Sequence, residues 1–420
     1  MSLLRSQLNY RHAQQLENRT NRLICRLYSS NRTIKANPSF IEHDVLFLRQ
    51  HGAKHAKWHL SAPLKPESRV KLSYGASIYG KDLIGRRILD IVRDSAGNSV
   101  VLHEPSLASY IINSERLATP IYPNDATTIV SLLDLNPSRP GEEDVEEDQA
   151  PPLEIFEAGT GMGSLTLHIA RALHAANPPL PAPLRQILIS SPFKPHYNFS
   201  TSRGCLDISP EEQASLDEYA SSRRAILHTL DRNSKHSRAA YKLVRNFRRA
   251  QYLPSVDFHV GSVDEYLSRR LDQNGGQPFL SRAILDLPSA HENAERVIQA
   301  LHPNGLLILF KPSISQIADF QAWSNETKQP VRMEKVIELY STTTSDGGVH
   351  DSSGGRHWDV KTVVPRAEQG EGGNNKPVQV MRPRVGERVA GGGFVAVLRR
   401  WPVSEMPLQE APEEETEVQE

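Results

Sequence analysis

The second half of the chain alternates short apolar runs with amphipathic stretches. Seven runs are rich in Val, Ile, Leu and Phe, and most are followed by a segment with helical periodicity. Buried parallel strands have this continuous apolar character, and helices connect them. We therefore expect an α/β fold, a seven-stranded sheet covered by helices on both faces. The predicted strands are 153–158, 224–231, 256–261, 282–288, 305–312, 335–340 and 392–401.

The pattern before this region is different. Short apolar runs separated by turn residues, with the segment SAGNS (95–99) as a hairpin loop, predict a small β domain over 36–118. A helix is expected over 106–114. A second, amphipathic helix is expected to begin near Asn124, after a Pro-bounded segment. The α/β domain is assigned to 119–403.

Four segments interrupt the α/β pattern, namely 137–152, 175–222, 341–356 and 365–391. They lack the periodicity of core elements, so we expect surface insertions. The run RQILIS (185–190) inside the second segment fits either an extra strand or a stray hydrophobic segment.

Charge is distributed unevenly, although the formal net charge is zero. Residues 1–35 are rich in Arg and hold Glu17 as their single acid, which favours a transit peptide for the mitochondrial matrix over a disordered basic tail. The nucleus is the alternative location. Acidic residues concentrate in 141–148 and in 404–420. We expect the tail 404–420 to be disordered. The remaining chain is mildly basic, which permits an RNA partner.

The sequence lacks the features of membrane-spanning, disulfide-rich and zinc-binding proteins. No apolar run has the length of a membrane span. The two cysteines, Cys25 and Cys205, form neither a disulfide framework nor a CxxC zinc motif, so we expect no metal and a reducing compartment.

A glycine-rich turn follows the first predicted strand of the α/β domain. A strand, a glycine turn and a helix place backbone N–H groups around a ligand. Gly159, Gly161 and Gly163 are spaced G-x-G-x-G, whereas dinucleotide turns use G-x-G-x-x-G. Glu157 precedes them, and its carboxylate repels a pyrophosphate but attracts an ammonium or sulfonium group. The turn therefore favours S-adenosylmethionine over NAD; a purely structural glycine turn is the alternative.

Acidic residues follow three later strands. Asp231 is placed to bind the cofactor ribose or to cap the next helix. Asp264 either borders the adenine of the cofactor or begins a helix. Asp286, in LDLPS, lies at the carboxyl edge of the sheet, where substrates of open α/β sheets bind. A carboxylate there can accept a hydrogen bond from an exocyclic amine and stabilise positive charge on a ring nitrogen during methyl transfer.

Several motifs in order resemble the tRNA (adenine-N1)-methyltransferases that modify the T-loop adenine, in a fungal-type mitochondrial form. The resemblance covers most of 72–401 and rests on ATPIYPNDATTIVSLLDL, EAGTGMGSLTL, FHVGSVDE, LDLPSAHE, LHPNGLLILFKPSISQI, HWDVKTV and GGFVAVLRRW. It implies a class I S-adenosylmethionine-dependent methyltransferase fold, tRNA as substrate, and a homotetramer or a heterotetramer with a non-catalytic sister subunit.

The resemblance also implies the site. Asp286 and Tyr122 are the catalytic-pocket residues, and Tyr122 lines the pocket for an extruded adenine, with simple packing as its alternative. His357 and Trp358 stand near the target, and His291 departs from the family pattern after LDLP. The predicted cofactor-binding residues are Glu157, Gly159, Thr160, Gly161, Gly163, Ser164, Asp231, Asp264 and Asp286.

The leading hypothesis is the catalytic subunit of such an enzyme. The alternatives are the same chemistry on adenine in mitochondrial rRNA or mRNA, and a non-catalytic RNA-binding subunit. A further feature is a basic stripe that follows Asp231 at helical spacing. It fits either a phosphate track or a solvated outer face, and consists of Lys235, Arg238, Lys242, Arg245 and Arg249.

Overall fold

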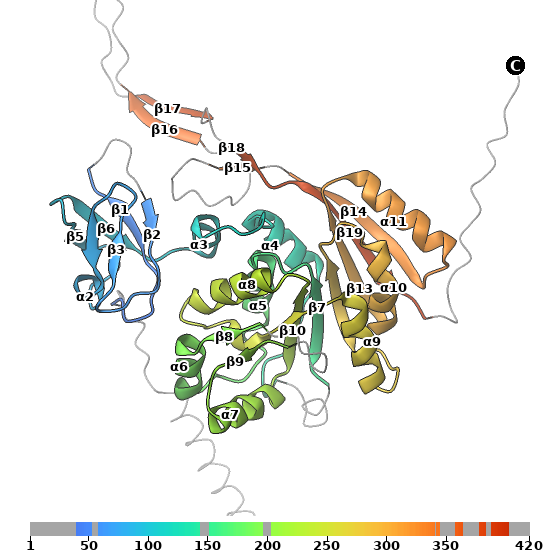
Figure 1. Ribbon diagram of the computed structural model, residues 1–420. Helices are drawn as coiled ribbons and strands as arrows, with labels where there is room; N and C mark the ends of the chain where they lie inside the picture. The colour runs from blue at the N-terminus through green and yellow to red at the C-terminus, as the bar shows by residue number, and fades with distance from the viewer. Residues whose placement is uncertain are drawn as a thin grey trace, which may run out of the picture.

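A computed structural model shows two folded parts, a small β domain and a larger α/β domain (Figure 1). The described residues are 39–52, 58–142, 151–195, 203–340, 342–344, 358–363, 378–383 and 388–402. The predicted transit peptide, the acidic tail and most of the acidic run at 141–148 lie outside these residues, so the predictions for them stay as they are.

The β domain contains an antiparallel sheet in the order β2-β1-β6-β5. SAGNS is the predicted hairpin loop, since Arg93 pairs with Ser99 across it. Buried Leu46, Leu48 and Leu102 fill the core of the domain. Its elements are β1 (Phe47–Gln50), β2 (Trp58–Leu60), β3 (Arg69–Lys71), β4 (Ser77–Tyr79), α2 (Gly80–Leu83), β5 (Ile91–Arg93) and β6 (Ser99–His103).

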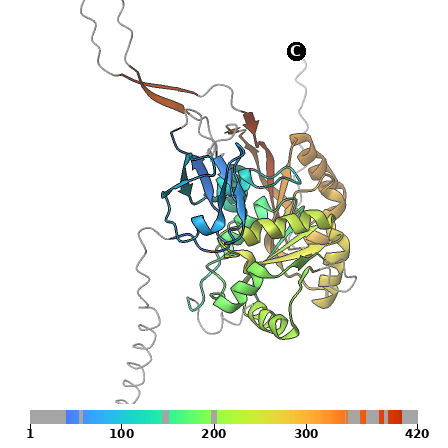
Figure 2. The same cartoon turned by 60° about the vertical axis from the view of Figure 1, so that its left-hand side comes forward.

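Two helices lead from the β domain to the sheet, at the predicted positions. α3 (Leu107–Asn113) is capped by the Ser106 side chain, and α4 (Pro123–Leu132) begins with a proline, whose fixed φ suits the first helical turn. The Tyr110 hydroxyl donates to the carbonyl of Leu243 at 2.9 Å. This contact fixes α3, the helix that follows the β domain, beside α8 (Ser234–Asn246) of the sheet domain (Figures 1 and 2).

All seven predicted strands are confirmed, and they form one sheet in the order β11-β10-β7-β12-β13-β19-β14. The five strands β11, β10, β7, β12 and β13 run parallel, while β19 is antiparallel to both of its neighbours. The strands are β7 (Leu153–Ala158), β10 (Ala225–Asp231), β11 (Val256–Val260), β12 (Leu280–Leu285), β13 (Leu301–Lys311), β14 (Val331–Leu339) and β19 (Gly393–Arg400).

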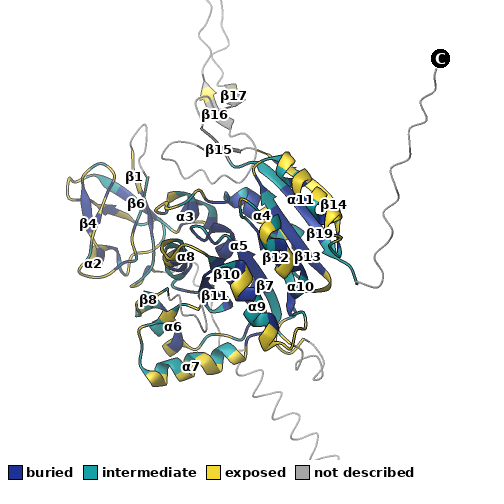
Figure 3. Ribbon diagram, turned by 45° about the vertical axis from the view of Figure 1, so that its right-hand side comes forward, coloured by how far each residue is buried: buried dark blue, intermediate teal, exposed yellow. Residues whose placement is uncertain are grey.

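Helices cover both faces of this sheet, as predicted, and leave the strands buried between them (Figure 3). One hydrophobic cluster joins the sheet to α4, α5 (Ser164–Leu173) and α8 (Ser234–Asn246). A second cluster joins it to α9 (Val263–Gln273), α10 (His291–Ala300) and α11 (Ile314–Glu326). Because the parallel strands end at one edge, the residues that follow β7, β10, β12 and β13 are brought together there.

Residues 175–222 differ from the prediction of a surface insertion without core elements. RQILIS is part of helix α6 (Ala182–Ser190), neither an extra strand nor a stray segment. The reason is the four-residue spacing of Leu184 and Leu188, which places both on one buried helix face. The other elements of the segment are β8 (Phe193–Lys194), β9 (Cys205–Leu206) and α7 (Pro210–Ser221).

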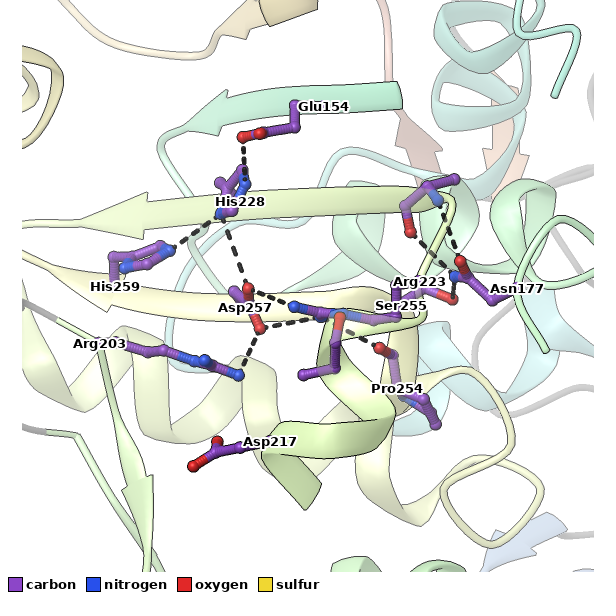
Figure 4. Close-up of polar contacts among 12 residues, drawn as sticks. Glu154, Asn177, Arg203, Asp217, Arg223, His228, Pro254, Ser255, Asp257 and His259 are labelled. Atoms are coloured by element: carbon purple, nitrogen blue, oxygen red, sulfur yellow. Dashed lines mark hydrogen bonds and ion pairs between the residues drawn. The ribbon is translucent and has the colours of Figure 1, made fainter. Parts of the chain in front are cut away.

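This segment covers the edge of the sheet at β11. The N–H of Gly204 donates to the carbonyl of Phe258 at 2.9 Å, so the segment satisfies an acceptor of the edge strand. Arg203 from the segment and Arg223 at its end both bind Asp257 on β11 (Figure 4). The insertion therefore contributes packing and buried charge to the domain.

Two further predicted insertions, 341–356 and 365–391, lie between β14 and β19, where short two-stranded ribbons stand outside the main sheet (Figure 1). Most of their residues lie outside the described ranges, so the prediction of surface insertions stays a prediction. The ribbons pair β15 (Thr342–Thr344) with β18 (Arg388–Ala390), and β16 (Trp358–Val363) with β17 (Val378–Pro383). Of the helices in the described ranges, none combines the length and apolar character needed to cross a membrane.

Candidate active site

The glycine turn connects β7 to α5 at the carboxyl edge of the sheet. Gly159, Gly161 and Gly163 all have positive φ, at 99°, 53° and 88°, which side chains rarely tolerate. A Cβ at Gly159 would overlap the carbonyl oxygen of Asp286. The first glycine therefore allows the end of β7 to touch the end of β12, and it joins the predicted cofactor turn to the predicted catalytic carboxylate.

The third glycine sets where α5 begins. Gly163 is the N-cap of α5, and a Cβ there would lie 2.7 Å from that of Ala240 on α8. The close packing leaves the N-terminus of α5, with its free backbone N–H groups, at the edge of the sheet. Ser164 is buried, and its hydroxyl donates to the carbonyl of Ile121 at 2.5 Å. Through this bond the turn holds the segment that precedes Tyr122.

Glu157 is fully buried under the turn. Its Oε2 accepts hydrogen bonds from the hydroxyls of Thr166 and Thr229, both at 2.7 Å. Thr160, also buried, shares a hydroxyl contact with Thr229 at 2.7 Å. Burial, with a smaller contribution from the charges of Asp286 and Asp231, raises the pKa of Glu157 to about 7, although the two threonine hydrogen bonds lower it. A cation above the turn would favour the ionised form of this carboxyl group.

Asp231, at the end of β10, holds the turn from the other side. Its Oδ2 accepts from the N–H of Gly161 at 3.0 Å, and its Oδ1 accepts from the N–H of Asn233 at 2.8 Å. The cap of α8 is Asn233, so the alternative of Asp231 as that cap is wrong. His236 also contacts Asp231 at 3.3 Å. Asp231 is therefore fixed at the glycine turn.

Asp286 directly follows β12 and lies beside the turn. Its N–H donates to the carbonyl of Ala158 at 2.9 Å, which continues the pairing of β12 with β7. Burial raises the pKa of Asp286 to about 6; the charge of Lys311 opposes this rise and that of Asp231 adds to it. Glu157, Asp231 and Asp286 thus form a group of interacting carboxylates.

Lys311 is a site residue that the sequence reasoning missed. It ends β13 and is only 2% exposed, and its ammonium donates to the carbonyls of Leu287 and Pro288. The signal was available in GLLILFKP, where a single charge ends an otherwise apolar strand.

Tyr122 lies at the N-cap of α4 and is half-buried. The guanidinium of Arg116 lies 5.8 Å from the centre of its ring. Three residues on, Asp125 is buried and accepts from the N–H of Gly392 at 3.1 Å, which ties α4 to the start of β19. The TPIYPND block therefore belongs structurally to the site edge, and Asp125 is a second residue that the sequence reasoning did not single out.

The other predicted positions do not join this group. Asp264 is exposed in the first turn of α9, where it pairs with Arg296 at 3.1 Å, so the helix-start alternative is the one observed. His291 begins α10 with its ring 6.4 Å from that of Trp323. His357 lies outside the described residues, and Trp358 belongs to strand β16.

The arrangement suits a cationic cofactor. The three coupled carboxylates repel one another, and a sulfonium and an ammonium group would offset that repulsion. The glycines carry no side chain, so the turn leaves room for a ligand beside the N-terminus of α5. No group of acidic, His or Cys side chains suited to a metal ion occurs within the described ranges.

Comparisons with known proteins agree with this chemistry. No family model matches the chain. Two curated relatives, the tRNA (adenine(58)-N(1))-methyltransferases TrmI from two strains of Thermus thermophilus, are each 24% identical over 314 residues, which is 75% of this chain and 82% of each relative. A solved S-adenosylmethionine-dependent O-methyltransferase from Thermotoga maritima has the same fold, with a TM-score of 0.52 and 14% identity over 87% of this chain and 96% of that one. With its glycine turn and Asp286 in place, the chain is similar in sequence to these tRNA (adenine(58)-N(1))-methyltransferases and has the fold of an S-adenosylmethionine-dependent methyltransferase.

Proposed function

We propose that this protein is the catalytic subunit that methylates N1 of the T-loop adenine in tRNA. The observation that carries the proposal is the close approach of Gly159 to the backbone of Asp286, which brings the residue with the proposed catalytic carboxylate next to the cofactor turn. The curated relatives act on adenine 58 of tRNA by name, which supplies the acceptor. An intact turn and an intact Asp286 argue against a non-catalytic RNA-binding subunit.

The residues divide the work as follows. S-adenosylmethionine, when bound, supplies a methyl group on a positively charged sulfur. Glu157, Asp231 and the free N–H groups at α5 would hold it. Asp286 accepts a hydrogen bond from the exocyclic amine of the adenine and stabilises the positive charge that the ring gains when N1 forms its bond to carbon. Tyr122 offers an aromatic face to the extruded base, because N1 lies on the pairing edge and must leave the helix to react.

Incubation of the purified full chain with labelled S-adenosylmethionine and a tRNA transcript tests the proposal. We expect label in the transcript with adenine in the T-loop, a primer-extension stop at that base, and neither when the base is replaced by guanine. Label with an rRNA or mRNA fragment but none with tRNA would favour the alternative substrates. Cofactor binding without label on any RNA would contradict the proposal, provided that a sister subunit added to the assay also restores nothing.

The basic stripe is divided by its surroundings. Arg249 pairs with Asp44 of the β domain at 3.1 Å and so stabilises the domain contact, whereas Arg245 packs near the ring of Tyr241 on its own helix. Lys235 and Arg238 are exposed and have no ion pair among the described residues. They lie on the first turns of α8, which begins beside Asp231. We infer that this half contacts tRNA phosphates.

Reversal of both charges, Lys235→Glu with Arg238→Glu, is therefore expected to raise the KM for tRNA by about tenfold or more and to leave kcat within about twofold. The slope of log affinity against log salt should fall by about one to two. The matched control is Lys328→Glu with Arg332→Glu, two exposed cations near the connection between α11 and β14. Equal effects of the two pairs on KM would contradict the assignment.

Assembly and location complete the proposal. The resemblance supplies the expectation of a homotetramer or a heterotetramer with a sister subunit, which light scattering of the purified chain, alone and with the sister subunit, would distinguish. The Arg-rich residues 1–35 support a mitochondrial location, with the nucleus as the alternative.

A further inference from the structure

Lys311 occupies an unusual place for a lysine. It is the last residue of β13, a strand whose preceding Leu306, Leu307, Ile308 and Leu309 are fully or almost fully buried, and it is itself 2% exposed. Lysine is almost never fully buried unless its charge has a partner, because removing an ammonium group from water is costly. A buried lysine at the catalytic edge therefore needs an explanation from its surroundings.

Its hydrogen bonds explain part of its position. The ammonium donates to the carbonyl oxygens of Leu287 and of Pro288, the latter at 3.2 Å. These are the two residues that follow Asp286, in the loop between β12 and α10. Lys311 thus fixes the backbone immediately after the catalytic carboxylate.

Its charge explains the rest. Two charged side chains from other strands act on Asp286: Asp231 on β10 opposes its ionisation, and Lys311 on β13 favours it. Asp286 in turn raises the pKa of Glu157 on β7. Lys311 is thus the cation in a group whose other members are acids. The interaction is mutual, since burial lowers the pKa of Lys311 and the charge of Asp286 raises it.

We infer that Lys311 is a positioning residue that holds Asp286 against the substrate adenine and supplies the positive charge that keeps this carboxylate ionised. The inference rests on the proposed function, because it gives Asp286 a proton-dependent task. A purely structural lysine would stabilise the loop but would leave the pH dependence of the reaction unchanged.

The pH profile of kcat/KM tests whether the positive charge of Lys311 keeps Asp286 ionised. Lys311→Met removes the ammonium with little change in volume, so the acid limb should move upward by about one to two pH units. Lys311→Arg keeps a charge and should keep the midpoint of the wild type. A wild type that does not methylate tRNA would refute the proposed function instead. An active wild type together with an unshifted Lys311→Met profile would refute the role of Lys311.

Thermal unfolding between pH 5 and 8 gives a second readout that does not depend on turnover. A raised pKa means that ionised Asp286 destabilises the fold above that pKa, and more so without Lys311. The Tm deficit of Lys311→Met should therefore shrink as the pH falls and Asp286 takes up its proton. In an Asp286→Asn background the deficit should not depend on pH.

Three results of the thermal unfolding experiment would overturn the inference. The first is a Tm deficit of Lys311→Met that depends equally on pH with Asp286 present and with Asp286→Asn. The second is a Tm deficit that does not depend on pH when Asp286 is present. The third is loss of folding in Lys311→Met, Lys311→Gln and Lys311→Arg alike, which would assign the lysine to the structure alone.

Discussion

Asp286→Ala is expected to reduce methyl transfer to tRNA by about 10²- to 10⁴-fold, the range typical for a group that acts on charge or protons in the transition state. Affinity for S-adenosylmethionine should stay within a few-fold, because Glu157, Asp231 and the turn remain. Among the described residues, no hydrogen bond joins the Asp286 side chain to the turn, and its backbone N–H, which pairs with Ala158, survives the substitution. Single-turnover methylation and calorimetric cofactor titration measure the two quantities separately.

The pH profile of kcat/KM for the wild type should show the titration of the Asp286 carboxyl group. Burial, together with Asp231, raises the pKa of Asp286 to about 6, so the carboxylate is ionised above that value and protonated below it. The acid limb of kcat/KM should therefore fall near pH 6. Glu157, whose pKa is raised to about 7, interacts with Asp286, so the observed midpoints belong to the pair. The acid limb of the kcat profile should lie at a lower pH than that of kcat/KM, because a bound cation favours the ionised forms of Asp286 and Glu157.

Asp286→Asn is the matched control, since it keeps the shape and removes the charge. It should lose nearly as much activity as alanine and should lose the acid limb near pH 6. Asp264→Asn, at the exposed acid of α9, should retain the activity and the profile of the wild type. Normal turnover in Asp286→Ala would exclude the assigned role of the carboxylate.

The fold could be predicted because its strands are buried on both faces. Runs such as LEIFEA and GLLILFKP carry their apolar character in consecutive residues, and the boundaries of β7 match the prediction. The positive-φ glycines and the acids that end strands were also local signals, and the sheet topology brings Asp231 and Asp286 to the same turn.

The parts that could not be predicted depend on contacts between distant residues. RQILIS has too few residues to distinguish a helix from a strand by periodicity, and only the packing of Leu188 against the sheet domain decides it. Asp231 and Asp264 lie at or after strand ends, and the sequence does not distinguish their roles. In the structure Asn233 caps α8 in place of Asp231, and Asp264 forms an exposed ion pair with Arg296. The partners of Lys311 likewise lie more than twenty residues away in the chain.

A buried charge network on β11 also depends on contacts between residues distant in the chain. Substitution in this network is expected to have the largest effect on the stability of the fold. Arg223 binds Asp257 with two hydrogen bonds, of 3.0 and 2.9 Å, and both side chains are 6% exposed. The half-exposed Arg203 adds a contact of 2.8 Å to the same carboxylate, and His228 lies 3.9 Å from it (Figure 4). The group borders a cavity of about 280 Å³ between the 175–222 segment and β11.

Arg223→Met is expected to lower the free energy of unfolding by about 3–5 kcal/mol, because it leaves Asp257 buried without its main partner. The second substitution Asp257→Leu in the same chain should recover much of this loss, since it removes the charge left without a partner. Urea unfolding followed by circular dichroism measures both. Arg399→Met breaks a two-contact pair with Glu334 that is about one-third exposed, so it should cost only about 1 kcal/mol or less.

The same network predicts how acid acts on the fold. Burial alone would raise the pKa of Asp257, but the charges of Arg223 and Arg203 and the hydrogen bonds with Arg223 hold it well below its usual range. A lowered carboxyl pKa contributes stability that is fully present above the unfolded value of about 3.9 and is lost as the pH falls through the folded value. The stability gap between wild type and Asp257→Asn should therefore be constant from pH 8 to about 5 and should narrow below about pH 4. A gap that widened on acidification would show that Asp257 is protonated in the folded chain.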